Sequence, residues 1–481
     1  MNFEVVNAWI DGKPALVDGG ASMDITAPWL GKPIATIRCG GTDLVDRAVR
    51  SASAAFLRCR ATPLAERIDW LNHGADQIER MIDEFIGISV LDIGKPMRAA
   101  RFETLRTAAF MRSVAQQASC LGGEVVPLDA TRAGAGLLGL TRRVPYGVVA
   151  AVTPFNAPAN LLMQKLAPAL AAGNAVVVKP SLEGTRTALL IAQCLKNAGV
   201  PDGLCNIVPG GVPEATALAA HRLVAVVTIT GGTAAGEALA RVAGAKKFIG
   251  ELGGNSPNIV LADADLADAA KRIAASGFEA AGQQCISAQR VIVEEAVYDE
   301  FLPIFIQEAR KLKVGDPALP DTDVGPVINK RAADRIMEMI ESAVAEGAKL
   351  QTKPDRNNCL IAPTIVTDAA VQSRIVQQEI FGPAVAVLRA RNAQDALDLA
   401  NNCEFGLQGS VFTRSLDAAI RLSEGLNTGS VWINEGSRFR LDNYPFGGVG
   451  RSGHGREGAR FAIEEYTQWK FTGIRLPPAA A

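Results

Sequence analysis

The sequence predicts an α/β fold in which parallel sheets are covered by helices. The chain has 481 residues, which is too many for one hydrophobic core, so two or three domains are expected. From about residue 147 onward, short apolar runs alternate with segments of helical periodicity. The apolar runs are continuous, which indicates strands buried on both faces and therefore a doubly wound arrangement.

A first α/β unit is predicted between residues 147 and 253. Its expected strands are GVVAAVTPF, NAVVVKP, CNIVPG, LVAVVTITG and KFIGELGG. The helices between them are PANLLMQKLAPALAAG, GTRTALLIAQCLKNAG, VPEATALAAH and TAAGEALARVAG. Alternation of this kind is typical of a parallel sheet.

A second α/β unit is predicted over residues 256 to 452. Its candidate strands are SPNIVL, RVIVEE, PTIVTD, AVAVLRA and GSVFT, with helices such as FLPIFIQEARKLK and KRAADRIMEMIESAVAEG. Residues 123 to 147 break the pattern and suggest two strands joined by a turn of small residues. Such a hairpin has unpaired edges, so we expect another subunit to cover it.

The composition excludes several classes of partner. Lys+Arg 49 against Asp+Glu 50 gives a net charge of -1, so neither nucleic acid nor an anionic membrane is expected as a partner. No apolar run reaches the roughly 18 residues of a membrane span, and no signal-peptide pattern is visible at the N-terminus. A cytoplasmic location is therefore the default expectation.

The chain has eight cysteines, without CxxC pairs, and only three histidines. The cysteines are expected to be free thiols, and a bound metal is not expected. Cys285, in GFEAAGQQCISAQRVIV, is either an ordinary buried thiol or a nucleophile. A nucleophilic thiol usually needs a histidine base, and no histidine lies in a recognisable partner motif. We therefore expect a carboxylate that acts through water.

Two further candidates follow predicted strands. Glu251 ends the strand KFIGE, at the carboxyl end where open α/β sheets place ligands, although a solvated strand-end glutamate is the alternative. Asn156 lies between Pro154 and Pro158, which fix the local backbone. Its amide is a candidate oxyanion donor, or else a residue that turns the chain or caps a helix.

Three segments suggest a nucleotide site. TITGGTAAG, residues 228 to 236, leads from a strand into a helix whose free N–H groups and dipole favour phosphate. Lys179 ends another strand, and its ammonium group is suited to ribose hydroxyls or phosphate. Glu379 and Phe381 flank a tight turn in EIFGP. Each segment could equally be an ordinary strand-to-helix junction.

Together the motifs resemble those of the aldehyde dehydrogenase superfamily, over essentially the whole chain. In the family's order they are TPFNAP, VVVKPS, ITGGTAAG, ELGGNSP, FEAAGQQCISAQR, EIFGP and PFGGVGRSGHGREG. The resemblance implies that Cys285 attacks an aldehyde to give a thiohemiacetal, whose oxyanion is held by Asn156 and the cysteine N–H. After hydride transfer to nicotinamide, Glu251 activates water to hydrolyse the thioester. Lys165 matches a lysine assigned to proton relay.

The resemblance also implies NAD or NADP as the cofactor. Glu379 and Phe381 match residues near the nicotinamide ribose, and Lys179 matches one at the adenosine ribose. The complete implied set is Thr153, Pro154, Phe155, Lys179, Ser181, Gly231, Gly232, Gly236, Leu252, Glu379 and Phe381.

The sequence departs from the family pattern at two cofactor positions. Leu182 stands where NAD-preferring members often have a glutamate that repels the phosphate of NADP, and Glu183 lies one residue further on. A block against NADP is therefore not expected. Gly232 replaces a commoner serine, which should loosen one phosphate contact without abolishing the site.

The family fold implies a domain plan. A Rossmann-type cofactor domain would comprise residues 1–122 and 147–253, and an α/β catalytic domain residues 254–455. Residues 123–146 and 456–481 would form oligomerisation elements, which implies a homodimer or homotetramer.

Several residues are implied to line the substrate tunnel. They are Arg106, Asn160, Gln164, Gln284, Ile286, Arg438 and Phe439. Arg106, Arg438 and Arg440 either bind an anionic substrate group, as in some relatives, or form salt bridges and subunit contacts. The motifs are most similar to the branch that acts on lactaldehyde, semialdehydes and phosphonoacetaldehyde, so we expect a small polar or acidic aliphatic aldehyde.

Four other classes were weighed against this interpretation. An aromatic aldehyde dehydrogenase is one. A CoA-acylating enzyme is another, although such relatives usually lack a base at the position of Glu251. A cysteine hydrolase would reduce no cofactor. A non-catalytic scaffold would have no reason to keep Cys285, Asn156 and Glu251 together.

Overall fold

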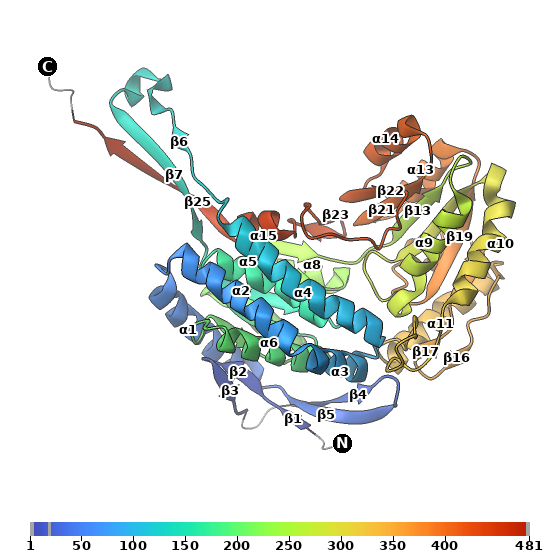
Figure 1. Ribbon diagram of the computed structural model, residues 1–481, viewed down its shortest axis with the longest axis horizontal. Helices are drawn as coiled ribbons and strands as arrows, with labels where there is room; N and C mark the ends of the chain where they lie inside the picture. The colour runs from blue at the N-terminus through green and yellow to red at the C-terminus, as the bar shows by residue number, and fades with distance from the viewer. Residues whose placement is uncertain (1–3, 18–20, 478–481) are drawn as a thin grey trace.

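The computed structural model describes residues 4–17 and 21–477. Two large sheets, one of eight strands and one of seven, carry most of the strands, and helices pack against them (Figure 1). The α/β prediction is confirmed. Within the described residues, no helix combines the length and the apolar character that crossing a membrane requires.

The larger sheet has the strand order β24-β12-β11-β8-β9-β10-β2-β3. Its five central strands are parallel: β8 (Val148–Thr153), β9 (Ala175–Pro180), β10 (Cys205–Ile207), β11 (Val224–Thr230) and β12 (Lys247–Glu251). All five coincide with predicted strands. Three antiparallel edge strands were not predicted: β2 (Ala8–Ile10), β3 (Lys13–Ala15) and β24 (Gly453–His454).

The register of this sheet gathers the ends of its strands at one edge. Thr153 pairs with Pro180, and Thr230 pairs with Glu251, so the carboxyl ends of four strands lie together. The strand order reverses between β8 and β11, so the carboxyl end of β8 is a topological switch point, the position at which open α/β sheets bind ligands.

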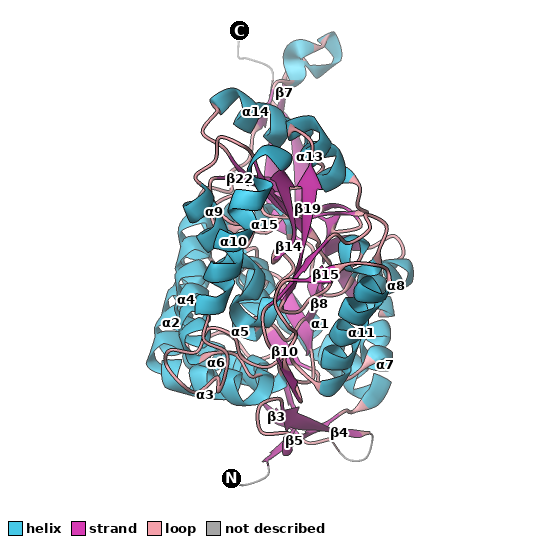
Figure 2. Ribbon diagram, turned by 90° about the vertical axis from the view of Figure 1, so that its right-hand side faces the viewer, coloured by secondary structure: helices cyan, strands magenta, loops and turns pink. Residues whose placement is uncertain are grey.

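Helices cover both faces of the larger sheet. Figure 2 shows α2, α4, α5 and α6 on one face, and α1, α7 and α8 on the other. Their bounds are α1 (Gly41–Cys59), α2 (Leu64–Arg80), α3 (Ile82–Ile93), α4 (Met97–Ala118), α5 (Pro158–Ala171), α6 (Thr185–Asn197), α7 (Val212–Ala220) and α8 (Thr233–Ala243). Every residue of α5 is buried, because α4 packs over it.

The second sheet has the strand order β15-β18-β19-β14-β13-β21-β22. Its strands are β13 (Ser256–Val260), β14 (Ala288–Glu294), β15 (Lys349–Leu350), β18 (Thr364–Thr367), β19 (Ala384–Ala390), β21 (Gln408–Phe412) and β22 (Ser430–Ile433). The helices around it are α9 (Leu266–Phe278), α10 (Glu295–Lys311), α11 (Lys330–Ala345), α12 (Arg374–Gln377), α13 (Ala393–Asn401) and α14 (Leu416–Gly425). The predicted division into domains stays a prediction, and β24 shows that the chain returns to the first sheet near its end.

The predicted hairpin projects from the body with a third strand beside it (Figure 1). Its first strand, β6 (Val125–Val126), is short because Pro127 follows and has no N–H to donate. Two short 3-10 turns lead to β7 (Leu137–Pro145), and β25 (Thr467–Arg475) pairs with all of β7. The chain itself thus covers one edge of the hairpin. Residues 478–481, the end of the second predicted oligomerisation element, lie outside the described residues.

Three small sheets and one helix complete the fold. The N-terminal sheet contains β1 (Glu4–Val6), β4 (Ser22–Ala27) and β5 (Lys32–Arg38). The two-stranded sheets pair β16 (Arg356–Asn357) with β17 (Leu360–Ile361), and β20 (Phe405–Gly406) with β23 (Val449–Gly450). Helix α15 (Ala459–Glu465) packs on α4 and α5 and leads into β25.

Candidate active site

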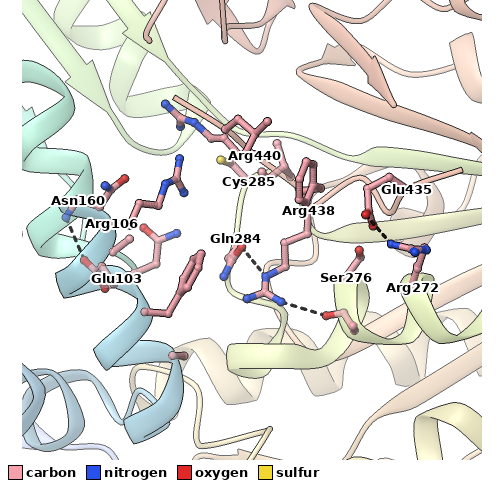
Figure 3. A pocket seen from close by; sticks show the side chains of 18 of the residues that line it. Glu103, Arg106, Asn160, Arg272, Ser276, Gln284, Cys285, Glu435, Arg438 and Arg440 are labelled. Atoms are coloured by element: carbon pink, nitrogen blue, oxygen red, sulfur yellow. Dashed lines mark hydrogen bonds and ion pairs between the residues drawn. The ribbon is translucent and has the colours of Figure 1, made fainter. Parts of the chain in front are cut away.

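A cavity of about 610 Å³ lies between α4 and α5 on one side and α9 and the loop of residues 435–441 on the other. Cys285 lies in its wall (Figure 3). Six of the predicted substrate residues also line it: Arg106, Asn160, Gln284, Ile286, Arg438 and Phe439. The cavity therefore unites residues that are up to about 330 positions apart in the sequence, and their roles stay predictions.

Cys285 lies between the turn η3 (Glu279–Gly282) and β14. Burial and the negative charge of Glu379 raise the pKa of its thiol to about 12, against the opposing effect of Arg440. The chain after Glu251 can approach Cys285 closely because residue 254 is a glycine. A Cβ on Gly254 would lie 2.1 Å from the carbonyl oxygen of Cys285. The ELGG motif thus packs directly on the segment that contains Cys285.

The amide of Asn156 is held next to Cys285. Its Nδ2 donates to the carbonyl oxygen of Gln283 at 2.8 Å, which leaves the second N–H of the amide for another acceptor. The backbone carbonyl of Asn156 accepts a hydrogen bond of 2.9 Å from Nζ of Lys95. The side-chain amide and the backbone carbonyl of Asn156 are therefore both held in place, as a preorganised oxyanion donor requires.

Lys95 belongs to a buried ion pair with Glu103. Glu103 Oε1 also accepts hydrogen bonds from the backbone N–H groups of Ala159, at 2.9 Å, and Asn160, at 3.1 Å. Because these N–H groups belong to the first turn of α5, Glu103 caps that helix from α4.

Glu251 lies in a buried charged cluster with Lys165, Arg440 and Glu457. Glu457 binds Lys165 at 3.0 Å and Arg440 at 2.9 Å, and these two cations hold its pKa below the usual range despite its burial. Glu251 is 2% exposed, and neither of its carboxylate oxygens has a hydrogen-bond partner in the described chain. Burial and the charge of Glu457 raise the pKa of Glu251 well above its usual value. Such a carboxyl group is suited to accept a proton.

The predicted arginines differ in their free hydrogen-bonding capacity. Arg106 is held by Asp442, with Nε at 2.9 Å and an Nη at 2.7 Å from its carboxylate. Asp442 also accepts from Gln164 at 2.8 Å, and Gln164 does not line the cavity. Nε of Arg440 and Nδ2 of Asn160 have no partner in the described chain, although both groups are buried. Arg440 and Asn160 therefore each keep an N–H group without a partner in the described chain.

A second group of predicted residues lies at the carboxyl edge of the larger sheet. Gly231 and Gly232 precede α8, whose N-terminus has no side-chain cap, and a Cβ on Gly232 would meet nothing within 4 Å. Two more of the predicted cofactor residues contact each other here, since Gly236 in α8 lies against the side chain of Leu252. The first turn of α8 thus offers free N–H groups in open space, which fits the phosphates of a dinucleotide.

The remaining predicted cofactor residues flank the same edge. Glu379 accepts from the N–H of Gly254 at 3.0 Å, and burial raises its pKa to about 7. The rings of Phe155 and Phe381 meet edge to face at 6.0 Å, close to the ends of β8 and of the EIFGP turn. Nζ of Lys179 donates to the carbonyl of Gly210 at 2.9 Å.

Ser181, Thr153 and Pro154 complete this group. Thr153 and Pro154 mark the carboxyl end of β8, and Ser181 follows β9 and accepts from the N–H of Gly184 at 3.0 Å. Leu182 packs against the small core of the N-terminal sheet.

Several residues of the site were not singled out from the sequence. Glu457 stands in the quoted motif PFGGVGRSGHGREG, but nothing in the local pattern shows that it pairs with Lys165. Lys95, Glu103 and Asp442 each contact a residue of the site that is 56 or more positions away, which only the fold brings together. Among the described residues, no cluster of three or more His, Cys, Asp or Glu side chains is arranged for a metal ion.

Comparison with known proteins agrees with this geometry. Residues 16–472 match the model of the aldehyde dehydrogenase family. The 3-sulfolactaldehyde dehydrogenase of Priestia aryabhattai is 37% identical over 455 residues, covering 94% of this chain and 95% of the relative. The lactaldehyde dehydrogenase of Methanocaldococcus jannaschii is 35% identical over 453 residues, covering 93% and 96%.

The solved structures agree as well. The NADP-dependent glyceraldehyde-3-phosphate dehydrogenase of Bacillus halodurans, solved with NADP, superimposes with a TM-score of 0.96 at 33% identity, covering 98% of this chain and 99% of the other. Cys285 and Asn156 thus line one cavity within a fold shared along nearly its whole length with these enzymes. The chain belongs to the aldehyde dehydrogenase family.

Proposed function

We propose that this enzyme oxidises a small anionic aliphatic aldehyde to the carboxylic acid, with NAD or NADP as the oxidant. One observation carries the proposal: Cys285 shares a cavity with Asn156, Arg106 and Arg440 and lies beside the buried carboxyl group of Glu251. The relatives named for sulfolactaldehyde and lactaldehyde support a small polar substrate.

The chemistry begins with the sulfur of Cys285, which attacks the carbonyl carbon of the aldehyde. The free N–H of the Asn156 amide then donates to the oxygen that becomes negative. The amide is already held by Gln283 and, through its backbone, by Lys95, so little reorganisation is needed as charge develops.

Loss of hydride from the thiohemiacetal leaves a thioester on Cys285. The nicotinamide ring, when bound, supplies the acceptor for that hydride. The residues that would hold the dinucleotide are the first turn of α8 after Gly232, together with Lys179 and Glu379. They fit a phosphate- and ribose-bearing group because they combine free N–H groups, an ammonium group and a carboxylate.

Glu251 completes the reaction by removing a proton from the water that attacks the thioester. Its raised pKa makes its carboxylate form a stronger base than that of an ordinary glutamate, and its two oxygens have no partner in the described chain. Lys165 and Glu457 lie in the same buried cluster and offer a route by which this proton leaves.

The cavity lining has more cationic than acidic side chains, and among the described residues Lys271 is the one lining cation without an ion pair. Six cationic side chains line it against three acidic ones: Lys95, Arg106, Lys271, Arg272, Arg438 and Arg440 against Glu103, Asp268 and Glu435. Figure 3 shows Arg106 and Asn160 on the wall formed by α4 and α5, and Arg440 beside Cys285 on the loop of residues 435–441. A carboxylate or sulfonate in the cavity would receive N–H groups from Arg440 and Asn160 that otherwise have no partner.

The projecting sheet supports a homo-oligomer. In β25, all residues after Thr467 are exposed, and they include Trp469, Phe471 and Ile474. Exposed apolar side chains on a strand with a free edge are typical of a surface that another chain covers. We propose that a second copy of this enzyme covers it.

A spectrophotometric assay tests the proposed function. Absorbance at 340 nm would be followed with small carboxylated, sulfonated and uncharged aldehydes, with NAD or NADP, and with or without CoA. We expect reduced cofactor without CoA and the highest kcat/KM for anionic aldehydes. A strict need for CoA would identify an acylating enzyme instead, and no reduction with any aldehyde would refute the proposal.

A further inference from the structure

We propose that Ser437 and Arg438 are positioning residues that hold the two neighbours of Cys285, so that the substrate-facing loop fixes the nucleophile. The inference rests on the proposed function in taking Cys285 as the nucleophile. It differs from the sequence-based expectation, in which Arg438 binds an anionic substrate.

The two residues reach both sides of Cys285. Nε of Arg438 donates to Oε1 of Gln284 at 2.9 Å, directly before the cysteine. Oγ of Ser437 donates to the carbonyl oxygen of Ile286 at 3.0 Å, directly after it. Adjacent residues of one loop thus bracket the nucleophile, and Figure 3 shows Arg438 extending towards Gln284 beside Cys285.

Arg438 also holds the turn that precedes the nucleophile. One of its Nη groups pairs with the carboxylate of Glu279 and donates to the carbonyl of Ala275, at the end of α9, at 3.4 Å. Two of its three nitrogens are therefore engaged by protein groups. Because these partners belong to the residue before Cys285, to the turn η3 and to α9, the guanidinium ties the loop to all three.

The nucleophile segment needs outside support because its backbone is strained. Ala280, Ala281 and Gly282 have φ values of 52°, 58° and 63°, so three consecutive residues adopt the left-handed region. Two of them are alanines, for which this region is unfavourable. A Cβ on Gly282 would lie 2.3 Å from the carbonyl oxygen of Gly382, so this residue cannot carry a side chain.

The loop that provides the support is itself fixed. Asn258 binds Ser437 twice: its Oδ1 accepts from the backbone N–H at 3.1 Å, and its Nδ2 donates to Oγ at 3.0 Å. Gln408, which is fully buried, donates to the backbone carbonyls of Ser437 and Phe439. Both anchors stand on strands of the second sheet, so the position of Cys285 is set by a rigid element.

The consequence for catalysis is a loss in the chemical step rather than in substrate binding. A misplacement of about 1 Å of a reacting atom can cost roughly 100-fold in rate. Removing either hydrogen bond to a neighbour of Cys285 should therefore slow attack on every aldehyde, whatever its charge.

The test compares Ser437→Ala and Arg438→Gln with Ser410→Ala. Ser410 is a matched control, because its buried hydroxyl donates to the carbonyl of Glu435 in the same loop but contacts no neighbour of Cys285. Each variant would be assayed for the pre-steady-state burst with two aldehydes of four carbons, one with a terminal carboxylate and one without. Thermal unfolding would establish that each variant folds.

We expect Ser437→Ala and Arg438→Gln to lower the burst rate by about tenfold or more for both aldehydes, with KM for the cofactor unchanged. Ser410→Ala should lower thermal stability to a similar degree as Ser437→Ala and leave the burst within about twofold. If Arg438→Gln instead raises KM for the carboxylated aldehyde alone, Arg438 is a substrate ligand and the proposal is wrong.

A second readout is independent of any substrate. Hydrogen exchange of the peptide that spans residues 279–287 should become at least about tenfold faster in Ser437→Ala and Arg438→Gln, but not in Ser410→Ala. Unchanged exchange in both variants would overturn the inference. If the unmodified enzyme oxidises no aldehyde, the proposed function fails, and the exchange result still decides whether Ser437 and Arg438 hold the segment.

Discussion

Nζ of Lys95 lies 2.9 Å from the backbone carbonyl oxygen of Asn156, and the same ammonium group pairs with Glu103 in the protein interior. The pair thus holds Asn156, which we propose as the oxyanion donor, and Glu103 caps the helix that follows it. A buried ion pair in this position links the stability of the fold to the geometry of catalysis.

Removing one partner of the Lys95–Glu103 ion pair should destabilise the fold and slow the reaction. We expect Lys95→Met or Glu103→Gln to lower the free energy of unfolding by about 3–5 kcal/mol and to lower kcat, because each leaves a buried charge without its counterion. The double variant should lose less free energy of unfolding than the two single variants lose in sum, which chemical denaturation can measure. Additive losses would show that the two side chains act independently.

Replacement of the catalytic carboxylate should separate the two halves of the reaction. We expect Cys285→Ala to abolish turnover, since no other sulfur lines the cavity among the described residues. Glu251→Gln should retain a burst of reduced cofactor but slow the steady state by about 100-fold or more, because water attacks the thioester unaided. Stopped-flow absorbance at 340 nm provides the measurement, and loss of the burst in Glu251→Gln would count against its role in deacylation.

The raised pKa of Cys285 predicts an unusual pH dependence of its alkylation. Only the thiolate reacts, and with a pKa of about 12 the thiolate fraction rises about tenfold per pH unit throughout the range below it. In the cofactor-free enzyme, the rate with iodoacetamide should therefore climb from pH 7 to 10, whereas free cysteine levels off above its pKa of ~8.5.

Glu379 contributes to that shift through its negative charge. Glu379→Gln should accordingly lower the pKa of Cys285 and speed alkylation at a given pH. The modified peptide would be quantified by mass spectrometry, with the exposed Cys120 of the same molecule as an internal reference. A plateau for Cys285 near pH 8 would contradict the predicted shift.

Charge recognition is tested at Arg106, which lines the cavity and is oriented by Asp442. Arg106→Gln should raise KM about tenfold for a carboxylated aldehyde and leave KM for an uncharged aldehyde of the same length nearly unchanged, since one cation is lost. Equal changes for both aldehydes would instead indicate a structural role.

The exposed strand β25 allows a test of assembly. Trp469→Ser together with Phe471→Ser removes two aromatic side chains that are 51% and 53% exposed in the single chain. If a second copy covers them, the double variant should shift to a smaller species in light scattering coupled to size-exclusion chromatography. An unchanged molar mass would exclude this surface as the main contact.

Much of the fold followed from local patterns. The five parallel strands of the larger sheet and the helices between them were predicted in place, because continuous apolar runs and helical periodicity are properties of short segments. The motifs also singled out Cys285 and Asn156, which line one cavity, and Glu251, whose charge acts on the thiol of Cys285. The edge strand β24 and the pairing of β25 with β7 were missed, since both join segments far apart in sequence.

The sequence by itself determined the α/β class, the positions of most strands and the residue types able to carry the chemistry, since each of these depends on neighbouring residues. Only the tertiary structure decided which charged groups are paired. It showed that Arg438 is engaged by Gln284 and Glu279, whereas Nε of Arg440 has no partner in the described chain. The physical reason is that ion pairs and hydrogen bonds depend on distances of about 3 Å between groups that the chain brings together only when both sheets have formed.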